Sequence, residues 1–128
     1  MAHKIYGGPN DFGPCGTLGV FDKGNLIAGV VFHNWQDEYG VIEISAAADD
    51  ARWLTKTVIR TIMAIVFDQH GCQQLATRQA VENERAVKNY RFLGFTEIIL
   101  PNMRGTGQHE LLMLLTADEW RGHKLNNQ

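Results

Sequence analysis

The spacing of apolar residues changes near residue 50 of this chain, and that change constrains the fold most strongly. Up to residue 47, apolar residues fall in short runs between turn-forming residues, which is typical of strands. From residue 52 to residue 70 they recur every three or four residues, which is typical of one helix face. Two adjacent rows form this face: Leu54, Val58, Ile62 and Val66, and beside them Ile59, Met63 and Phe67. Strands followed by such a helix predict helices packed on a sheet.

Three strands are predicted before the helix, at residues 17–21, 25–35 and 39–47. The sequence DKG supplies the first tight turn, in which Gly24 can take a positive φ. A polar turn at residues 36–39 separates the second strand from the third. Connections this short predict an antiparallel meander.

The helix is predicted to run for about five turns, with Asp49 or Asp50 as its N-cap and Gly71 at its end. The remaining elements are predicted at residues 73–79 (strand), 83–93 (helix), 95–100 (strand) and 109–116 (strand). The order βββ-α-β-α-ββ predicts an α+β fold with a central mixed, mostly antiparallel sheet and helices on its faces. The strand–helix–strand unit should cross over with right-handed chirality.

The length of 128 residues fits one domain, with an irregular Gly- and Pro-rich segment at residues 1–16 and a C-terminal tail at 117–128. No apolar run approaches the roughly 18 residues of a membrane span, and the first residues lack a signal-like apolar region. Without an export signal, Cys15 and Cys72 are expected to be reduced thiols, so a cytoplasmic protein is expected. The net charge of −2 is too small to decide the partner. The sequence shows no basic stripe, so no nucleic-acid binding is expected, although a basic face could still be assembled in three dimensions. No spacing matches a metal-ligand pattern, so no metal is expected.

Four features in order resemble the GNAT superfamily of acyl-CoA N-acyltransferases. A strand ends in SAAADD, a long helix ends at HGC before another strand, the segment NERAVKNYRFLGF follows, and a strand pair closes the chain. The segment repeats the family's pattern in Asn83, Ala86, Tyr90 and the pair Gly94-Phe95. The resemblance covers residues 17–116 and implies the GNAT-like acyltransferase fold. It also implies an N-acetyltransferase that moves an acetyl group from acetyl-CoA to a primary amine by direct attack.

The resemblance also implies which residues hold the cosubstrate. The strand before the long helix would bind the pantetheine arm through the backbone of Ile44, Ser45 and Ala46, and Asn83 and Ala86 would contact that arm. The pyrophosphate would lie at the start of the helix, against these residues: Arg52, Trp53, Leu54, Thr55 and Lys56.

Two departures from the family pattern stand out. The helix start reads ARWLTK, without the glycines of the family's loop, and the two helices that the family has between its first strands are nearly absent. The first turn of any helix still offers free N–H groups and a partial positive charge. Arg52 and Lys56 would add charge-assisted bonds, although both are equally interpretable as solvated helix residues.

Amide formation from a thioester needs a base for the amine and a proton for the departing thiolate. By resemblance, Tyr90 is the general acid, and the alternative is a core aromatic residue. Asn83 contacts the cosubstrate, caps its helix, or does both. Glu43 is a candidate general base, and the alternative is a surface residue of a half-exposed strand. The alternation of side chains cannot choose between the two, because a bulge in this strand would reverse the direction in which Glu43 faces.

Other functions remain open at this point. A non-catalytic module that keeps the fold would explain the glycine-free loop, and a different acyl-CoA would suit the same fold. The expected partner is a small-molecule or peptide amine acceptor, with a homodimer as an option. No nucleophile–base pair is recognisable in the sequence, which favours direct attack over an acyl-enzyme.

Overall fold

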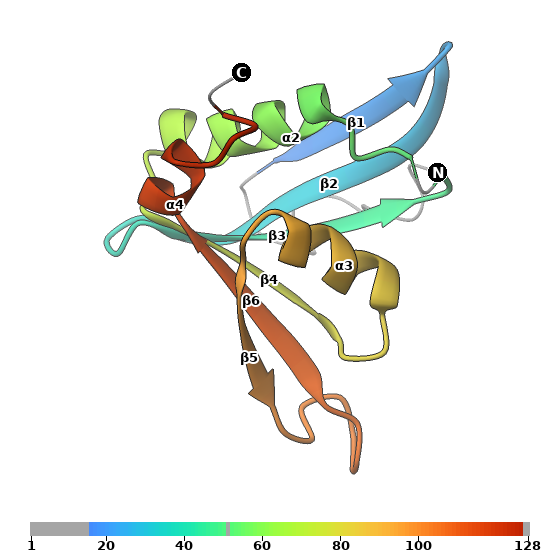
Figure 1. Cartoon of the computed structure of the whole chain (residues 1–128), viewed down its shortest axis with the longest axis vertical. Helices are drawn as coiled ribbons and strands as arrows, with labels where there is room; N and C mark the ends of the chain where they lie inside the picture. Colours follow the sequence, from blue (N-terminus) through green and yellow to red (C-terminus); the bar gives the residue numbers. More distant parts are fainter. Residues whose placement is uncertain (1–15, 51, 127–128) are drawn as a thin grey trace.

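A computed structural model describes residues 16–50 and 52–126, which form a six-stranded sheet with the strand order β1-β2-β3-β4-β6-β5 (Figure 1). The strands are β1 (Thr17–Asp22), β2 (Asn25–Gln36), β3 (Val41–Ala48), β4 (Gln74–Ala80), β5 (Thr96–Leu100) and β6 (Glu110–Thr116). The helices are α2 (Lys56–Met63), its π-helical continuation η2 (Ala64–Gln69), α3 (Glu84–Phe92) and α4 (Ala117–Arg121).

The strand pairing confirms the predicted sheet. β1, β2 and β3 form an antiparallel meander, and its first turn uses positive φ at Lys23 and Gly24. β4 pairs with β3 in parallel, whereas β6 pairs antiparallel with both β4 and β5. The sheet is therefore mixed and mostly antiparallel. The predicted strand at residues 109–116 begins one residue later than expected.

One face of the sheet carries the core. Ile42 and Ile44 of β3, Leu75 of β4 and Met113 of β6 lie in a single buried cluster with side chains from all the helices described. Because side chains alternate across a strand, Glu43, Ala76 and Arg78 lie on the opposite face. We call the face with the buried cluster the helix face and the opposite face the open face. Both names refer only to the helices in residues 16–50 and 52–126.

The long helix starts later than its apolar pattern suggests. Its N-cap is Thr55, whose hydroxyl accepts a hydrogen bond from the Val58 N–H at 3.3 Å, so the prediction of Asp49 or Asp50 is wrong. Asp50 instead bonds Arg52 within a turn, and that local pair competes with a helix start. The end is as predicted, because Gly71 takes φ 64° directly after the helix.

The C-terminal tail contains an element that the sequence interpretation missed. Ala117–Arg121 form α4, which begins with a capping box between Thr116 and Glu119. Trp120 of α4 is buried in the core. The predicted irregular segment at residues 1–16 lies outside the described residues, apart from residue 16. No helix in the described ranges is long and apolar enough to cross a bilayer.

Candidate functional site

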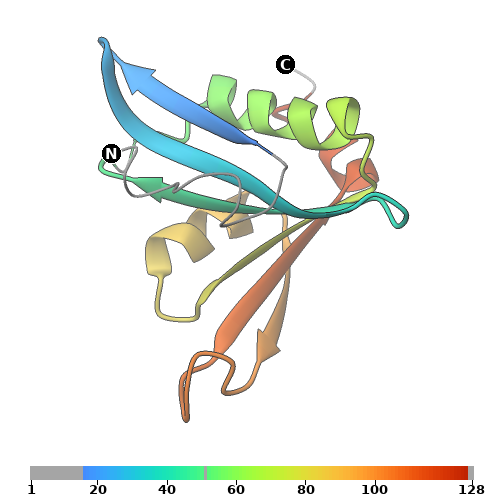
Figure 2. The same ribbon diagram turned by 180° about the vertical axis from the view of Figure 1, so that it is seen from behind.

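The sheet forks between β3 and β4. These strands pair only from Val41↔Gln74 to Ile44↔Thr77. Past that point, residues 45–48 stay with β2 and residues 78–80 stay with β6, so the two halves of the sheet diverge (Figures 1 and 2). Within the described residues, no strand covers the facing edges of the fork. Backbone N–H and C=O groups on these edges are therefore available to an extended ligand.

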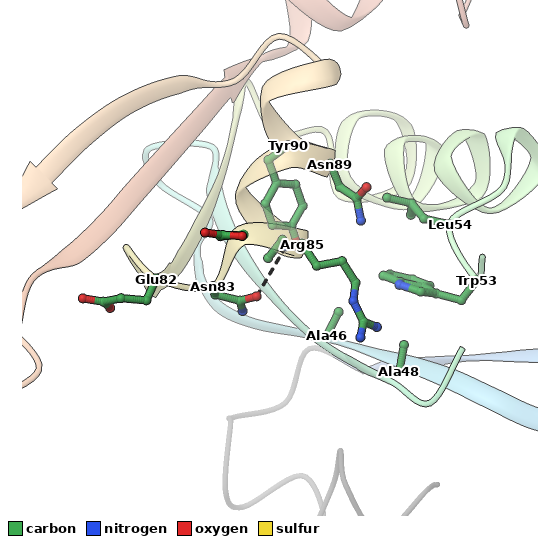
Figure 3. Close-up of a pocket in the computed structure, with 11 residues that line it drawn as sticks. Ala46, Ala48, Trp53, Leu54, Glu82, Asn83, Arg85, Asn89 and Tyr90 are labelled. Carbon is green, nitrogen blue, oxygen red and sulfur yellow. Dashed lines mark hydrogen bonds between the residues drawn. The ribbon is translucent and has the colours of Figure 1, made fainter. Parts of the chain in front are cut away.

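A pocket of about 370 Å³ lies beside the fork. It is bounded by the end of β3, by the segment that leads into α2, and by α3 (Figure 3). Its lining residues are Ala46, Ala48, Trp53, Leu54, Glu82, Asn83, Glu84, Arg85, Ala86, Asn89 and Tyr90. The pocket thus brings together two chain segments that lie about thirty residues apart in sequence, and both segments carry predicted site residues.

Tyr90 combines the two interpretations that its sequence position left open. It lines the pocket and also packs against the core, with its ring centroid 5.1 Å from that of Phe95. Burial raises the pKa of Tyr90 to about 12, so the phenol keeps its proton at neutral pH. No group in residues 16–50 and 52–126 hydrogen bonds its hydroxyl. The hydroxyl is therefore a donor that a ligand in the pocket can engage.

Asn83 is the N-cap of α3, which is one of the two roles expected for it. Its side-chain oxygen accepts a hydrogen bond from the Ala86 N–H at 3.4 Å, and both residues line the pocket (Figure 3). The side-chain amide nitrogen of Asn83 is left for another partner. The cap and a ligand contact are therefore compatible.

The predicted pyrophosphate residues divide into two groups. Trp53 and Leu54 line the pocket, and Thr55 caps α2. Arg52 does not line it: its side chain is 89% exposed and forms an ion pair with Asp50 at 3.1 Å. Lys56 is exposed and also lies outside the pocket lining. The segment before α2 therefore brings no cation into the pocket.

Arg85 is a pocket residue that the sequence interpretation missed. Its side chain runs from α3 across the pocket toward Ala46, Ala48 and Trp53 (Figure 3). It makes no hydrogen bond or ion pair within the described ranges, whereas Glu82 points away from it. The available signal was its place beside Ala86, on the helix turn that follows the Asn83 cap.

The three residues predicted on β3 have different surroundings. Ile44 is buried in the core at the last paired position of β3 with β4. Ala46 lines the pocket on the helix face. Ser45 lies on the open face, where its hydroxyl is 2.7 Å from Nε2 of His33. The fork therefore has a ligand-accessible pocket on one face and a Ser–His pair on the other.

Thr77 closes the base of the fork. It is 1% exposed, and its hydroxyl has no hydrogen-bond partner within the described residues. Buried hydroxyls in native proteins are nearly always paired. An unpaired one at this place is what a site for a polar ligand group would contain.

Glu43 lies on the open face and is buried, so the alternative of a surface carboxylate is wrong. One of its oxygens accepts a hydrogen bond from Nε of Arg78 at 3.2 Å, and the other accepts one from the side-chain amide of Asn34. Asn34 reaches it from an irregularity in β2, where it adopts φ 51°. The bulge is thus on β2 and leaves the alternation of β3 intact.

The surroundings of His33 predict that stability depends on pH. Burial lowers its pKa, and the nearby charge of Glu43 opposes this only in part. The folded chain therefore binds a proton at His33 less readily than the unfolded chain does. We expect the free energy of unfolding to fall as the pH drops from about 7.5 to 5.5. Urea unfolding at half-unit pH steps measures this fall, and a slope unchanged in His33→Gln would contradict it.

Comparisons with known proteins identify the fold. No protein-family model matches the sequence, and no curated protein matches it. A mutant of the spermidine N-acetyltransferase SpeG from Vibrio cholerae superposes with a TM-score of 0.72 at 21% identity, over 83% of this chain and 68% of that chain. Mutant forms of the spermidine/spermine N-acetyltransferase SpeG from the same organism give 0.71 at 21% identity, over 84% and 70%. A probable acetyltransferase gives 0.67 at 19% identity, over 76% and 59%. The chain therefore has the GNAT acetyltransferase fold, as predicted.

Proposed function

We propose that this chain is an N-acetyltransferase that moves the acetyl group of acetyl-CoA to a primary amine by direct attack. The observation that carries the proposal is the fork between β3 and β4, with the Tyr90 pocket beside it. Such a site holds a long, thin arm against unpaired strand edges and brings its end to the fork. The SpeG structures, which belong to spermidine N-acetyltransferases of the same fold, support this reaction class.

The residues present fit acetyl-CoA at three points. The facing edges of residues 45–48 and 78–80 offer backbone partners to the amide groups of the pantetheine arm. The unpaired Thr77 hydroxyl offers a further hydrogen bond at the base of the fork. Arg85 offers a guanidinium where the phosphates need positive charge. When bound, acetyl-CoA supplies an activated thioester carbonyl.

The glycine-free helix start is compatible with this placement. Free N–H groups exist in the first turn of a helix whatever its sequence, and glycine only eases close approach. Here the guanidinium of Arg52 is held by Asp50, and Arg85 supplies from α3 the charge that the family's loop usually contributes. The phosphate-binding role moves from one helix start to the neighbouring helix.

Proton transfers at the fork follow from the two faces. Tyr90 donates a proton to the thiolate as the bond from carbon to sulphur breaks and the bond from nitrogen to carbon forms. The same burial that raises the pKa of Tyr90 raises the basicity of a thiolate held beside it. The acceptor approaches from the open face, because acetyl-CoA in the pocket occupies the helix face.

The base that takes the proton of the amine lies on the open face. Glu43 is the sequence-based candidate, but both of its oxygens already accept hydrogen bonds from Arg78 and Asn34. His33 is neutral at pH 7 because burial lowers its pKa, and it lies against Ser45 at the fork. We therefore favour His33 as the base, with Glu43 placing Arg78.

Binding of the cosubstrate is the first test. Acetyl-CoA at 100 times its Kd should raise the free energy of unfolding by about 2.7 kcal/mol. Thermal melts with acetyl-CoA, CoA and ADP measure the shift, and radiolabelled acetyl transfer to a panel of amines then measures turnover. No shift at millimolar acetyl-CoA would remove the proposal.

Two rival functions give different outcomes in the same assays. A non-catalytic module, which the glycine-free segment favours, would show no melting shift with acetyl-CoA and no acetyl transfer to any amine. An acyltransferase that uses a different acyl-CoA would transfer a longer acyl chain faster than it transfers acetyl. The Ser45–His33 pair also allows an acyl-enzyme. If the protein gains the mass of one acetyl group from acetyl-CoA without an acceptor, and Ser45→Ala abolishes this gain, an acyl-enzyme mechanism replaces direct attack.

A further inference from the structure

Two arginines and two glutamates alternate along the open face, starting at the fork. Arg78 donates from Nε to Glu43 at 3.2 Å and from Nη1 to Glu110 at 3.1 Å. Arg104 donates from Nη1 to the second oxygen of Glu110 at 2.9 Å. We propose that Arg78 and Arg104 bind a carboxylate of the acceptor, so that the acceptor is an amine that also carries a carboxylate, as amino acids do. This inference rests on the proposed acetyltransferase function.

Burial decides which charges of this network face a ligand. The side chains of Glu43 and Glu110 are 10% and 11% exposed, whereas those of Arg78 and Arg104 are 42% and 43% exposed. The carboxylates therefore lie beneath the guanidinium groups and are already paired. A polycationic acceptor would find no unpaired carboxylate in this network, while an anionic group would meet two guanidinium groups first.

The two guanidinium groups have donors to spare. Each carries five N–H groups in a planar fork that matches the two oxygens of a carboxylate. Arg78 uses Nε and Nη1, and Arg104 uses Nη1. Nη2 of Arg78 and both Nε and Nη2 of Arg104 have no acceptor in residues 16–50 and 52–126. The buried glutamates fix the guanidinium groups in place, which lowers the entropic cost of binding.

The position of the network suits an acceptor whose amine is at the fork. Arg78 is the first residue of β4 past the last paired position, and it lies on the same face as Ser45 and His33. Arg104 comes from the β5–β6 loop, whose shape is fixed by the Arg104 N–H donating to the Gln108 carbonyl at 3.0 Å. A carboxylate held there leaves the amine of the same molecule free to point toward the fork.

Matched acceptors test this inference. Initial rates with acetyl-CoA are compared for amino acids and short peptides, for the same compounds as C-terminal amides, for phosphoethanolamine, and for spermidine. We expect kcat/KM to be at least about tenfold higher for a carboxylate than for its amide, which corresponds to about 1.4 kcal/mol. The advantage should be lost in Arg104→Gln and in Arg78→Lys, which keeps the charge but not the planar fork.

Controls separate this inference from the function on which it rests. Arg91→Gln removes an exposed arginine that pairs with Glu97 on the helix side and should leave the preference intact. Thermal melts confirm that each variant is folded. Equal rates for acid and amide, or a spermidine preference unaffected by the arginine variants, would refute the carboxylate site while leaving acetyl transfer established. A preference for phosphoethanolamine over carboxylates would assign the network to phosphate instead. Acetyl-CoA binding without transfer to any amine would remove both proposals.

Discussion

Tyr90→Phe should lower kcat for acetyl transfer by about 10²- to 10⁴-fold, the range over which general acid–base groups contribute. The substitution removes one hydroxyl and keeps the ring, so the contact with Phe95 and the pocket wall should survive. The loss should reside in kcat, because the hydrogen bond strengthens as negative charge grows on sulphur. The affinity for acetyl-CoA should change little.

Stability measurements separate catalysis from packing in this variant. The Tyr90 hydroxyl has no hydrogen-bond partner within the described residues, so its removal should leave the melting temperature unchanged. Tyr39→Phe is a matched control, because Tyr39 is 69% exposed and lies in the β2–β3 turn, outside the pocket lining. Turnover at the wild-type rate in Tyr90→Phe, with a good acceptor, would leave Tyr90 with only its packing role.

The pH profile gives an independent check on the role of Tyr90. Since burial raises its pKa to about 12, the phenol stays protonated across the range in which the protein can be assayed. The profile of kcat should therefore show no falling limb from Tyr90 between pH 7 and 10. A limb that appears there in the wild type and vanishes in Tyr90→Phe would mean that the phenol ionises far more easily than its surroundings indicate.

Local sequence patterns predicted the elements well where the signal was local. The helix predicted at residues 83–93 is observed as Glu84–Phe92 with Asn83 as its N-cap, so local propensity and tertiary structure agree there. The start of α2 was misjudged because Asp50 has two competing local partners, a helix N-terminus and the side chain of Arg52. The local sequence pattern does not determine which of these two partners Asp50 binds.

Contacts between distant segments could not be read from the sequence. Glu43 lies thirty-five residues before Arg78 and sixty-seven before Glu110, and only the strand register places the three side chains together. Arg85 has an ordinary helix-surface spacing, and its place in the pocket depends on how α3 lies against the segment before α2. The resemblance supplied the motif residues of α3, but not the cation beside them.

Arg85→Ala should weaken acetyl-CoA binding by about 1.5–3 kcal/mol, the usual value of a hydrogen bond to a charged group. This corresponds to an increase in Kd of about 10- to 150-fold. Arg52→Ala is the matched control, because it removes the same side chain from a residue that pairs with Asp50 and does not line the pocket. Calorimetric titration of both variants with acetyl-CoA measures Kd. We expect Kd to stay nearly unchanged in Arg52→Ala.

Dephospho-CoA then locates the contact, because it lacks the 3′-phosphate and keeps the pyrophosphate. If Arg85 holds the pyrophosphate, Arg85→Ala weakens the binding of CoA and of dephospho-CoA equally. If Arg85 holds the 3′-phosphate, its substitution matters for CoA and has almost no effect with dephospho-CoA, as expected for two groups that act on one interaction. A larger loss in Arg52→Ala than in Arg85→Ala would return the phosphate site to the helix start, where the family resemblance places it, and would mean that the ion pair with Asp50 opens when the cosubstrate binds.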